Sequence, residues 1–295
     1  MQMQNSKTQQ AYLKLFLGLL LFGLNGSVAS FIALDSYEIV FLRTLIGSVF
    51  LIIMFLFSKK EPKGRVNKRD RLYIMISGMA MGVSWLFLYE AYRQIGVGIA
   101  TLIYYCGPMI VIAISPYIFG ERITKMTLVG FLMVILGMLA LNGDAFHQGG
   151  ISMGIFYCLF SATLYAIMVV FNKKAKAITG LENAMLQLFA SFLTVATFLF
   201  FKQGLSVFVL GDNLMPVLFL GIVNTGVSGY LYFSSMHQFS AGTIAICSYI
   251  EPVSSLVFAG VLLGEKLLAV QFFGALLILG GALVGEWSMS GRKLA

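Results

Sequence analysis

Long apolar runs separated by short polar segments follow one another along almost the whole chain. A membrane-spanning helix needs about 20 mainly apolar residues, and ten stretches are close to that length or longer. They cover approximately residues 12–32, 37–57, 72–94, 97–118, 124–142, 149–171, 182–201, 213–236, 241–262 and 268–288. The pattern predicts an all-α integral membrane protein with ten transmembrane helices.

A second pattern is an internal repeat with a shift of 144 residues. The matched pairs are Gly98/Gly242, Tyr105/Tyr249, Pro108/Pro252, Gly120/Gly264, Glu121/Glu265, Gly130/Gly274 and Gly137/Gly281. Each copy contains five spans, and because five is odd the second copy enters the membrane from the opposite side. We therefore expect residues 1–147 and 148–295 to form two five-helix repeats of inverted topology around a central cavity.

Composition and charge agree with a bilayer environment. The chain is 59% hydrophobic and 11% charged, whereas soluble domains carry roughly 25% charged residues. The net charge of +8 does not indicate nucleic-acid binding, because seven basic residues crowd the segment 59–71 and most others flank apolar runs. With a cytoplasmic N-terminus, sixteen Lys and Arg fall inside and three outside. The positive-inside rule then predicts that both termini face the cytoplasm, in the inner or plasma membrane.

Motifs for catalysis, metals and cofactors are missing from the sequence. Cys106, Cys158 and Cys247 stand singly in apolar runs, and His147 and His237 lack ligand spacing. No phosphate-binding loop, nucleophile elbow or dinucleotide fingerprint occurs. We expect a protein that is not an enzyme and needs no cofactor. Ten helices can close a bundle alone, so a monomer is the default expectation.

Three ionisable residues fall well inside predicted spans, where charge is expensive. Glu251 lies midway along its span and could accept a substrate ammonium or a coupling proton; alternatively it forms an internal hydrogen bond or an ion pair with Arg43 that locks the bundle. Arg43 is expected to reach the outer surface, and Glu90 to form a local surface pair with Arg93. Proton coupling is left open.

Two prolines at related positions predict paired backbone defects. Pro252 cannot donate to the carbonyl of Ser248, and Pro108 likewise frees the carbonyl of Tyr104. Interrupted spans in both halves of a transporter indicate the transport site. Glu121 and Glu265 end related spans, and we expect them to cap or orient the next helix.

Polar and aromatic side chains at helical spacing predict the lining of a central cavity. The candidate substrate-binding residues are Asn25, Trp85, Tyr89, Tyr104, Tyr165, Asn224, Tyr249 and Glu251. Further polar positions at membrane depth are Ser161, Asn172, Gln187 and Ser228. A cavity lined by rings and amides suits a small zwitterionic or aromatic metabolite better than an inorganic ion.

Short motifs in both halves carry a resemblance to a known family. They are Phe22-Gly23-Leu24-Asn25, Leu42-Arg43, Tyr105-Cys106-Gly107-Pro108, Gly120-Glu121, Tyr249-Ile250-Glu251-Pro252-Val253 and Leu263-Gly264-Glu265. In this order, and over essentially the whole chain, they resemble the drug/metabolite transporter superfamily, specifically its ten-helix EamA branch. One departure is Tyr165, where the family often has tryptophan; the exchange bears on cavity size.

The resemblance implies a secondary carrier of small organic solutes, commonly an exporter of amino acids or related metabolites, with a cavity framed by helices one, three and four of each half. Alternating access in the bilayer is the expected mechanism. A lipid or lipid-linked sugar flippase of the same fold is the alternative, and a membrane enzyme is a weaker one, because no nucleophile–base set is visible. The match does not identify the cargo.

Overall fold

The computed structural model describes residues 2–58, 67–95, 97–121, 123–141, 153–204, 210–262, 264 and 269–290. The regular elements within these ranges are all helical. The α-helices are α1 (Gln2–Phe22), α2 (Leu24–Ala29), α3 (Ser36–Phe57), α4 (Lys68–Ile95), α5 (Val97–Tyr104), α6 (Cys106–Phe119), α7 (Lys125–Leu141), α8 (Met153–Lys174), α9 (Gly180–Gln203), α10 (Leu214–Phe219), α11 (Ser228–Ser235), α12 (Ala241–Cys247), α13 (Ile250–Leu262) and α14 (Ala269–Ser290). The π-helix η3 (Leu220–Val227) and two short 3₁₀ turns, η2 (Gly211–Asn213) and η4 (Met236–Gln238), complete the set.

The helices coincide with the apolar runs of the sequence. Among the described residues, seven helical stretches are long and apolar enough to cross a membrane, and three further apolar helices are shorter. Only Phe239 and Ser240 separate η4 from α12. The protein is therefore a multi-pass membrane protein, and the regular elements of its described ranges are helical.

Polar residues at the helix ends decide where several of these helices begin and end. Asp35 starts α3 with a capping box: its carboxylate accepts from the Tyr37 N–H at 3.3 Å, and its own N–H donates to Glu38 Oε2 at 3.2 Å. At the end of α6, Gly120 adopts the left-handed conformation with φ of 67°. An L-residue with a side chain rarely adopts this conformation, so the glycine stops the helix there.

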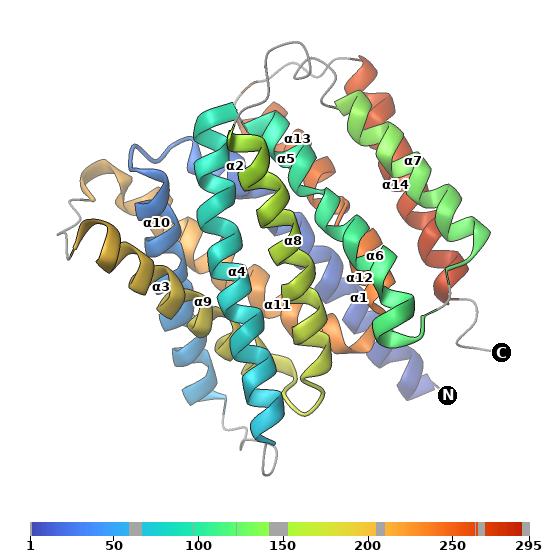
Figure 1. Cartoon of the computed structure of the whole chain (residues 1–295), viewed down its shortest axis with the longest axis horizontal. Coiled ribbons are helices and arrows are strands. Elements are labelled where there is room, and N and C mark those ends of the chain that lie inside the picture. Colours follow the sequence, from blue (N-terminus) through green and yellow to red (C-terminus); the bar gives the residue numbers. More distant parts are fainter. Residues whose placement is uncertain are drawn as a thin grey trace.

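The helices pack in antiparallel pairs that join distant parts of the chain, and α7 and α14 form such a pair along one edge of the molecule (Figure 1). A Cβ atom on Gly130 would lie 2.5 Å from the carbonyl oxygen of Gly281, and one on Gly137 would lie 2.6 Å from that of Gly274. Only glycine permits so close an approach, as in other membrane helix pairs. Helix α4 pairs with α8 in the same antiparallel sense, because Ser84 and Ser161 exchange hydrogen bonds while Ser77 donates to Met168 O at 2.7 Å.

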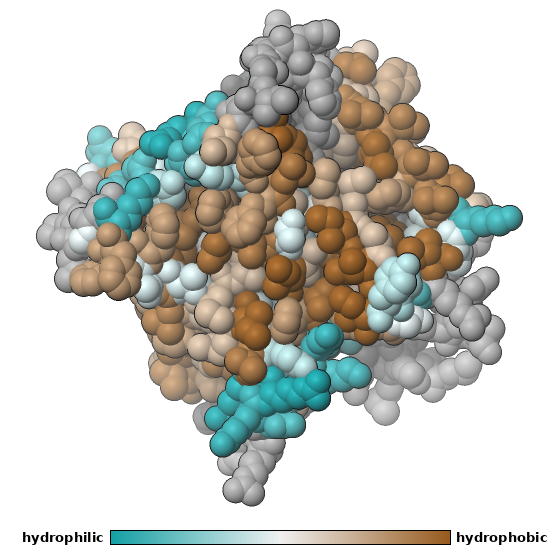
Figure 2. Space-filling model, in the orientation of Figure 1, coloured by the Kyte–Doolittle hydropathy of each residue, from teal (hydrophilic) through white to brown (hydrophobic). Residues whose placement is uncertain are grey.

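The surface is apolar where lipid would contact it. In Figure 2 a broad hydrophobic band crosses the visible face, and hydrophilic residues gather near its margins. Large side chains such as Phe57, Phe201 and Leu283 are exposed on the outside. Buried polar residues such as Asn172 and Asn183 lie inside and are hydrogen-bonded to each other at 3.0 Å. This distribution is the one expected when the solvent is hydrocarbon.

Candidate functional site

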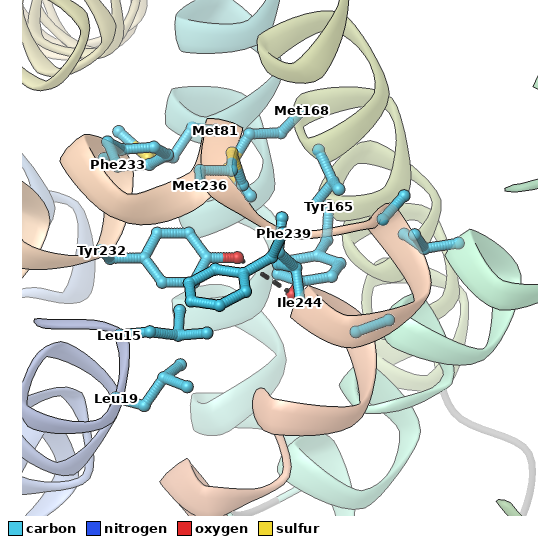
Figure 3. Close-up of a cluster of buried hydrophobic side chains, with 14 of the residues drawn as sticks. Leu15, Leu19, Met81, Tyr165, Met168, Tyr232, Phe233, Met236, Phe239 and Ile244 are labelled. Atoms are coloured by element: carbon cyan, nitrogen blue, oxygen red, sulfur yellow. Dashed lines mark hydrogen bonds between the residues drawn. The ribbon is translucent and has the colours of Figure 1, made fainter. Parts of the chain in front are cut away.

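A cavity of about 290 Å³ lies among α1, α2, α3, α4, α5, α8, α11 and α13, and Ser248, directly after α12, also lines it. At one end its wall contains Ser30 and Ser36, which flank the α2–α3 connection. At the other end its wall is formed by side chains that belong to a buried cluster, among them Leu19, Met81 and Met168. Figure 3 shows this cluster, in which the hydroxyls of Tyr165 and Tyr232 point toward each other at 3.4 Å. The cluster closes the cavity on that side.

Six of the eight predicted substrate-binding residues line this cavity. They are Asn25, Trp85, Tyr89, Tyr104, Tyr165 and Glu251. They come from five helices that are far apart in the sequence, so the fold gathers the aromatic and amide groups that the sequence pattern had singled out. Pro252, from the second broken span, also lines the cavity.

The other two predicted residues, Asn224 and Tyr249, lie outside the cavity wall. Asn224 is fully buried in η3 and donates to Leu21 O at 3.1 Å and to Asn25 Oδ1 at 3.3 Å. It therefore positions a cavity residue instead of facing the cavity. Tyr249 is buried and its hydroxyl donates to Tyr105 O at 2.9 Å.

Arg43 does not reach the outer surface, contrary to the expectation from sequence. Its residue exposure is 1%, and its guanidinium lines the cavity. Nε donates to Thr225 Oγ1 at 3.1 Å, Nη1 to Tyr89 OH at 2.6 Å and Nη2 to Asn25 Oδ1 at 3.1 Å. The cation also lies over the ring of Trp85, 4.2 Å from its centroid. Hydrogen bonds to three other segments hold the side chain inward, so it cannot extend to the surface.

The π-helix η3 supplies one of these contacts. The Thr225 hydroxyl donates to Leu220 O at 2.8 Å, five residues back, and accepts from Arg43. A π-turn adds a residue to the helical turn and is frequent at functional sites. A Cβ atom on Gly221 would lie 2.6 Å from Ile46, so the small residues of η3 bring it close to α3. Nothing in the apolar pattern of the sequence indicated this local widening.

Two helices are interrupted at related positions, close to where the prolines indicated. The first break is at Tyr105, between α5 and α6, and the second is at Ser248 and Tyr249, between α12 and α13. Pro108 and Pro252 are each the third residue of the helix that follows. Their missing N–H groups cost nothing there, because the N–H groups of a first helical turn lack intrahelical partners. The two breaks touch: the rings of Tyr105 and Tyr249 pack with their centroids 5.8 Å apart.

Glu251 is in the first turn of α13, directly after the second break, and lines the cavity. The Tyr105 side chain lies beside its carboxyl group. Glu251 and Arg43 share the cavity wall without a contact ion pair among the described residues, so of the two structural alternatives for Glu251 the direct pair with Arg43 is not formed, while the neighbouring Tyr105 side chain leaves the internal hydrogen bond open. The cavity therefore presents one cationic and one anionic group.

Aromatic side chains make up much of the remaining wall. Tyr92, which follows Trp85 and Tyr89 at helical spacing, lines the cavity with Tyr104 and Tyr165. Tyr232, which the sequence reasoning did not select, lines it as well. Tyr165 OH is 2.8 Å from Ser248 Oγ at the second break. A hydroxyl-bearing ring at membrane depth is a weak signal by itself, because aromatic residues also form interfacial belts and plain packing.

Three other polar positions of the spans lie away from the cavity. Asn172 Nδ2 donates to Gln187 Oε1 at 3.1 Å, and Gln187 Nε2 lies 3.9 Å from Met81 Sδ. Ser161 is bonded to Ser84 instead. These buried groups tie α4, α8 and α9 together, so their polarity is satisfied by packing partners.

Two glutamates make structural contacts, Glu121 with a distant helix and Glu90 with a neighbouring residue of its own helix. The Glu121 carboxylate accepts from the N–H groups of Ala241 at 2.7 Å and Gly242 at 3.0 Å, at the start of α12. It caps a helix of the other half instead of the next helix along the chain. Glu90 forms the expected pair with Arg93 at 2.7 Å. Glu265 and His147 lie outside the described residues.

The family of the chain follows from comparisons with known proteins. The model of the EamA-like transporter family matches residues 9–143 and 152–285. The chain is 24% identical to the uncharacterized transporter YxxF of Bacillus subtilis over 92% of this chain and 88% of that protein. It is also 24% identical to a probable amino-acid metabolite efflux pump of Escherichia coli, over 84% of this chain and 87% of the pump.

The fold is also similar to a known one. A solved crystal structure with 20% sequence identity matches with a TM-score of 0.79 and covers 97% of this chain and 99% of the other. The two stretches matched by the family model cover most of the chain, and the apolar helices and the interior cavity agree with a transporter. The chain belongs to the EamA-like transporter family.

Proposed function

We propose that the protein is a secondary transporter that exports a small organic metabolite, an amino acid or a related compound, across the cytoplasmic membrane by alternating access. The observation that carries the proposal is the cavity itself: an aromatic chamber with one cationic and one anionic side chain, reached by both broken helices. The name of the Escherichia coli relative, a probable amino-acid metabolite efflux pump, supports the substrate class and the direction.

The contacts between α7 and α14 support two oppositely inserted repeats, residues 1–147 and 148–295. The shift of 144 residues turns Gly130 into Gly274 and Gly137 into Gly281. It therefore converts the contact Gly130–Gly281 into the contact Gly274–Gly137, which is also present. A two-fold axis in the membrane plane produces such reciprocal antiparallel contacts. The meeting of the two helix breaks at Tyr105 and Tyr249 follows the same rule.

Orientation follows from charge. Of the nineteen Lys and Arg residues other than Arg43, sixteen are on the side that we assign to the cytoplasm and three on the other. The beginning of α1 and the end of α14 lie toward the same end of the molecule in Figure 1, in keeping with two cytoplasmic termini. In this orientation the buried cluster of Figure 3 closes the cytoplasmic side, and the cavity reaches toward the external α2–α3 connection.

Alternating access requires that this closed side open while the external side closes. The closed side is held by apolar packing, by the aromatic pair Tyr12–Phe239 with centroids 4.5 Å apart, and by the Glu121 cap on α12. All of these contacts join different segments, so a rocking movement of the two halves would separate them together.

Flux measurements test the proposal. Purified protein in liposomes, offered a panel of amino acids, nucleosides and amines, should give saturable flux of at least one of them. Gly26→Leu is the matched variant: Gly26 lines the cavity, and a Cβ atom there would meet one atom within 4 Å, Ser255 Oγ at 3.9 Å. This variant should fold and lose flux. Absence of saturable flux of any organic solute would overturn the proposal.

The cavity volume bears on the flippase alternative. About 290 Å³ is at the lower end of the roughly 300–1,000 Å³ of small-molecule pockets. That size suits a compact metabolite better than a lipid-linked sugar. Crosslinking of photoactivatable lipids to cavity residues, with no flux of small solutes, would favour the flippase.

A further inference from the structure

Arg43 is a buried cation that no carboxylate of the described residues contacts, although Glu251 attracts it electrostatically without touching it. It forms no ion pair with any carboxylate in the described part of the chain. Its three hydrogen-bond acceptors are two hydroxyls and one amide oxygen, all uncharged. A guanidinium has five N–H groups, so two of them lack an acceptor among the described residues.

The surroundings hold this charge in place with uncharged acceptors, and no carboxylate of the described residues is in direct contact with it. Ionisable groups at membrane depth usually face a partner or a cavity and mark substrate pathways. Three fixed acceptors and the face of Trp85, 4.2 Å from the cation, orient the guanidinium on the cavity wall. A guanidinium that is already oriented loses little entropy when it binds a carboxylate, and its planar fork matches the two oxygens.

We propose that Arg43 binds the carboxylate of the transported metabolite and so sets the specificity of the cavity for carboxylate-bearing substrates. This inference rests on the proposed function. Glu251, the anionic group on the same wall, then faces the ammonium of a zwitterionic substrate. Arg43 and Glu251 attract each other electrostatically but make no contact ion pair, so a zwitterionic substrate can pair with both groups without first breaking a direct bond between them.

The residue that corresponds to Arg43 in the second half of the chain shows what this position requires for packing. The shift of 144 residues converts Arg43 into Gln187 and Thr225 into Met81. The contact Arg43–Thr225 thus has its counterpart in Gln187–Met81, where both side chains are neutral and Gln187 is fully buried away from the cavity. A glutamine at this position is therefore compatible with the packing of the fold, and the charge of Arg43 is an addition that packing does not require.

Matched ligand pairs test the inference. Phenylalanine and phenylalaninamide, and leucine and leucinamide, differ in whether they carry a carboxylate. Their binding is measured by the concentration that half-maximally raises the melting temperature, and their transport by flux into liposomes. The wild-type protein should prefer the carboxylate form by about 10- to 100-fold, the range for a charged hydrogen-bonding group. Arg43→Gln should abolish the preference; it should also lower the melting temperature without ligand, because the shorter glutamine cannot replace all three hydrogen bonds, so the preference is compared with that variant's own ligand-free value.

Two further variants make the test decisive. Arg69→Gln is the control, because Arg69 is exposed and hydrogen-bonded to Tyr73 OH at 2.6 Å, outside the cavity; it should keep the wild-type preference. Thr225→Val removes the acceptor of Arg43 Nε and keeps the charge. It should reduce the preference partly, and it replaces Arg43→Gln as the readout if that variant does not fold.

The outcomes separate the inference from the proposed function. Equal response of the wild-type protein to both members of each pair, or a preference that persists in Arg43→Gln, overturns the role of Arg43. If other solutes are transported while none of the four ligands stabilises the protein, the inference fails and the transport function stands. If no organic solute is transported, both fail.

Discussion

The two broken helices, α5–α6 and α12–α13, follow the same pattern but differ where it matters for the cavity. Glu251 in α13 corresponds to Gly107 in α6 under the shift of 144 residues. Glu251 places a carboxyl group on the cavity wall. A Cβ atom on Gly107 would lie 2.9 Å from Tyr165 Cδ1 and 3.0 Å from Ala162 O, so no side chain fits there.

This difference shows how two similar copies can make one polar site. In one copy the residue before the proline serves close packing against α8, and in the other it carries charge into the cavity. Arg43 and Gln187 differ in the same way, since the first lines the cavity and the second is buried among neutral groups. Side chains that differ between the corresponding positions of the sequence give the cavity one cationic and one anionic group.

The largest effect is expected when the carboxylate of Glu251 is introduced at the corresponding position of the first half, Gly107. Gly107→Glu would force a charged side chain into the contact with Tyr165 and Ala162. Overpacking and an unpaired buried charge together should cost at least about 3 kcal/mol. We expect loss of folded protein, measured by size-exclusion chromatography and thermal melting in detergent.

A smaller change at the same site provides its control. Gly107→Ala should cost about 1–3 kcal/mol through overpacking alone. At Gly229, in α11, a Cβ atom would meet nothing within 4 Å, so Gly229→Ala should melt at or above the wild-type temperature. If Gly107→Glu melts like the wild type, the packing explanation for the glycine is wrong.

Removing the negative charge of Glu251 tests whether transport depends on this carboxyl group of the second half. Glu251→Gln should fold and lower flux by about 10- to 100-fold through loss of a charged partner. If the carboxyl carries a coupling proton, the variant should also lose the pH dependence of flux, because glutamine does not titrate. Flux across a range of external pH measures both effects.

Glu182→Gln is the control for the Glu251 variant, since Glu182 is in the first turn of α9 and does not line the cavity. It should transport normally. Unfolding of Glu251→Gln would instead indicate that the carboxyl group serves the internal structure.

Substitutions of the two tyrosines at the helix breaks should have different effects, with Tyr249→Phe lowering mainly stability and Tyr105→Phe lowering mainly transport. Tyr249→Phe removes the donor to Tyr105 O and should cost about 0.5–1.5 kcal/mol. Tyr105 lies beside the Glu251 carboxyl and lines the cavity, so Tyr105→Phe should lower flux more than melting temperature. Equal effects of both variants on both measurements would argue against this division.

The smallest expected effect concerns the cap on α12. Glu121→Gln keeps one oxygen acceptor, enough for one of the two N–H groups of Ala241 and Gly242, and removes the negative charge at the helix start. The loss should be about 0.3–1 kcal/mol, read as a slightly lower melting temperature. Glu121→Ala, which removes the acceptor as well, should melt lower still. The reverse order would show that the carboxylate does not cap the helix.

Local patterns in the sequence predicted much of the fold. The apolar runs located the helices, because a span is recognised by its length and composition. Pro108 and Pro252 located the two interruptions to within a few residues, because a missing N–H disturbs the helix just before it. Asn25, Trp85, Tyr89, Tyr104, Tyr165 and Glu251 were singled out as polar or aromatic groups at membrane depth, and they do line the cavity.

The misses concern the direction in which a side chain points. Arg43 was expected near the surface, yet it faces inward; Asn224 and Tyr249 were expected in the cavity wall, yet they support neighbouring segments. The rotation of each helix about its axis depends on the neighbours against which it packs, and hydrophobicity gives little guidance when nearly all faces are apolar.

By itself, the sequence determined that this chain is a membrane protein, that it contains a repeat, and where its helices are interrupted, because these properties depend on composition and spacing within short segments. The tertiary structure decided which polar groups share one cavity. Thr225 is 182 residues from Arg43, and Tyr89 and Asn25 are 46 and 18 residues from it. Contacts across such separations depend on the register between helices and on a local π-turn, and no segment of the chain encodes these alone.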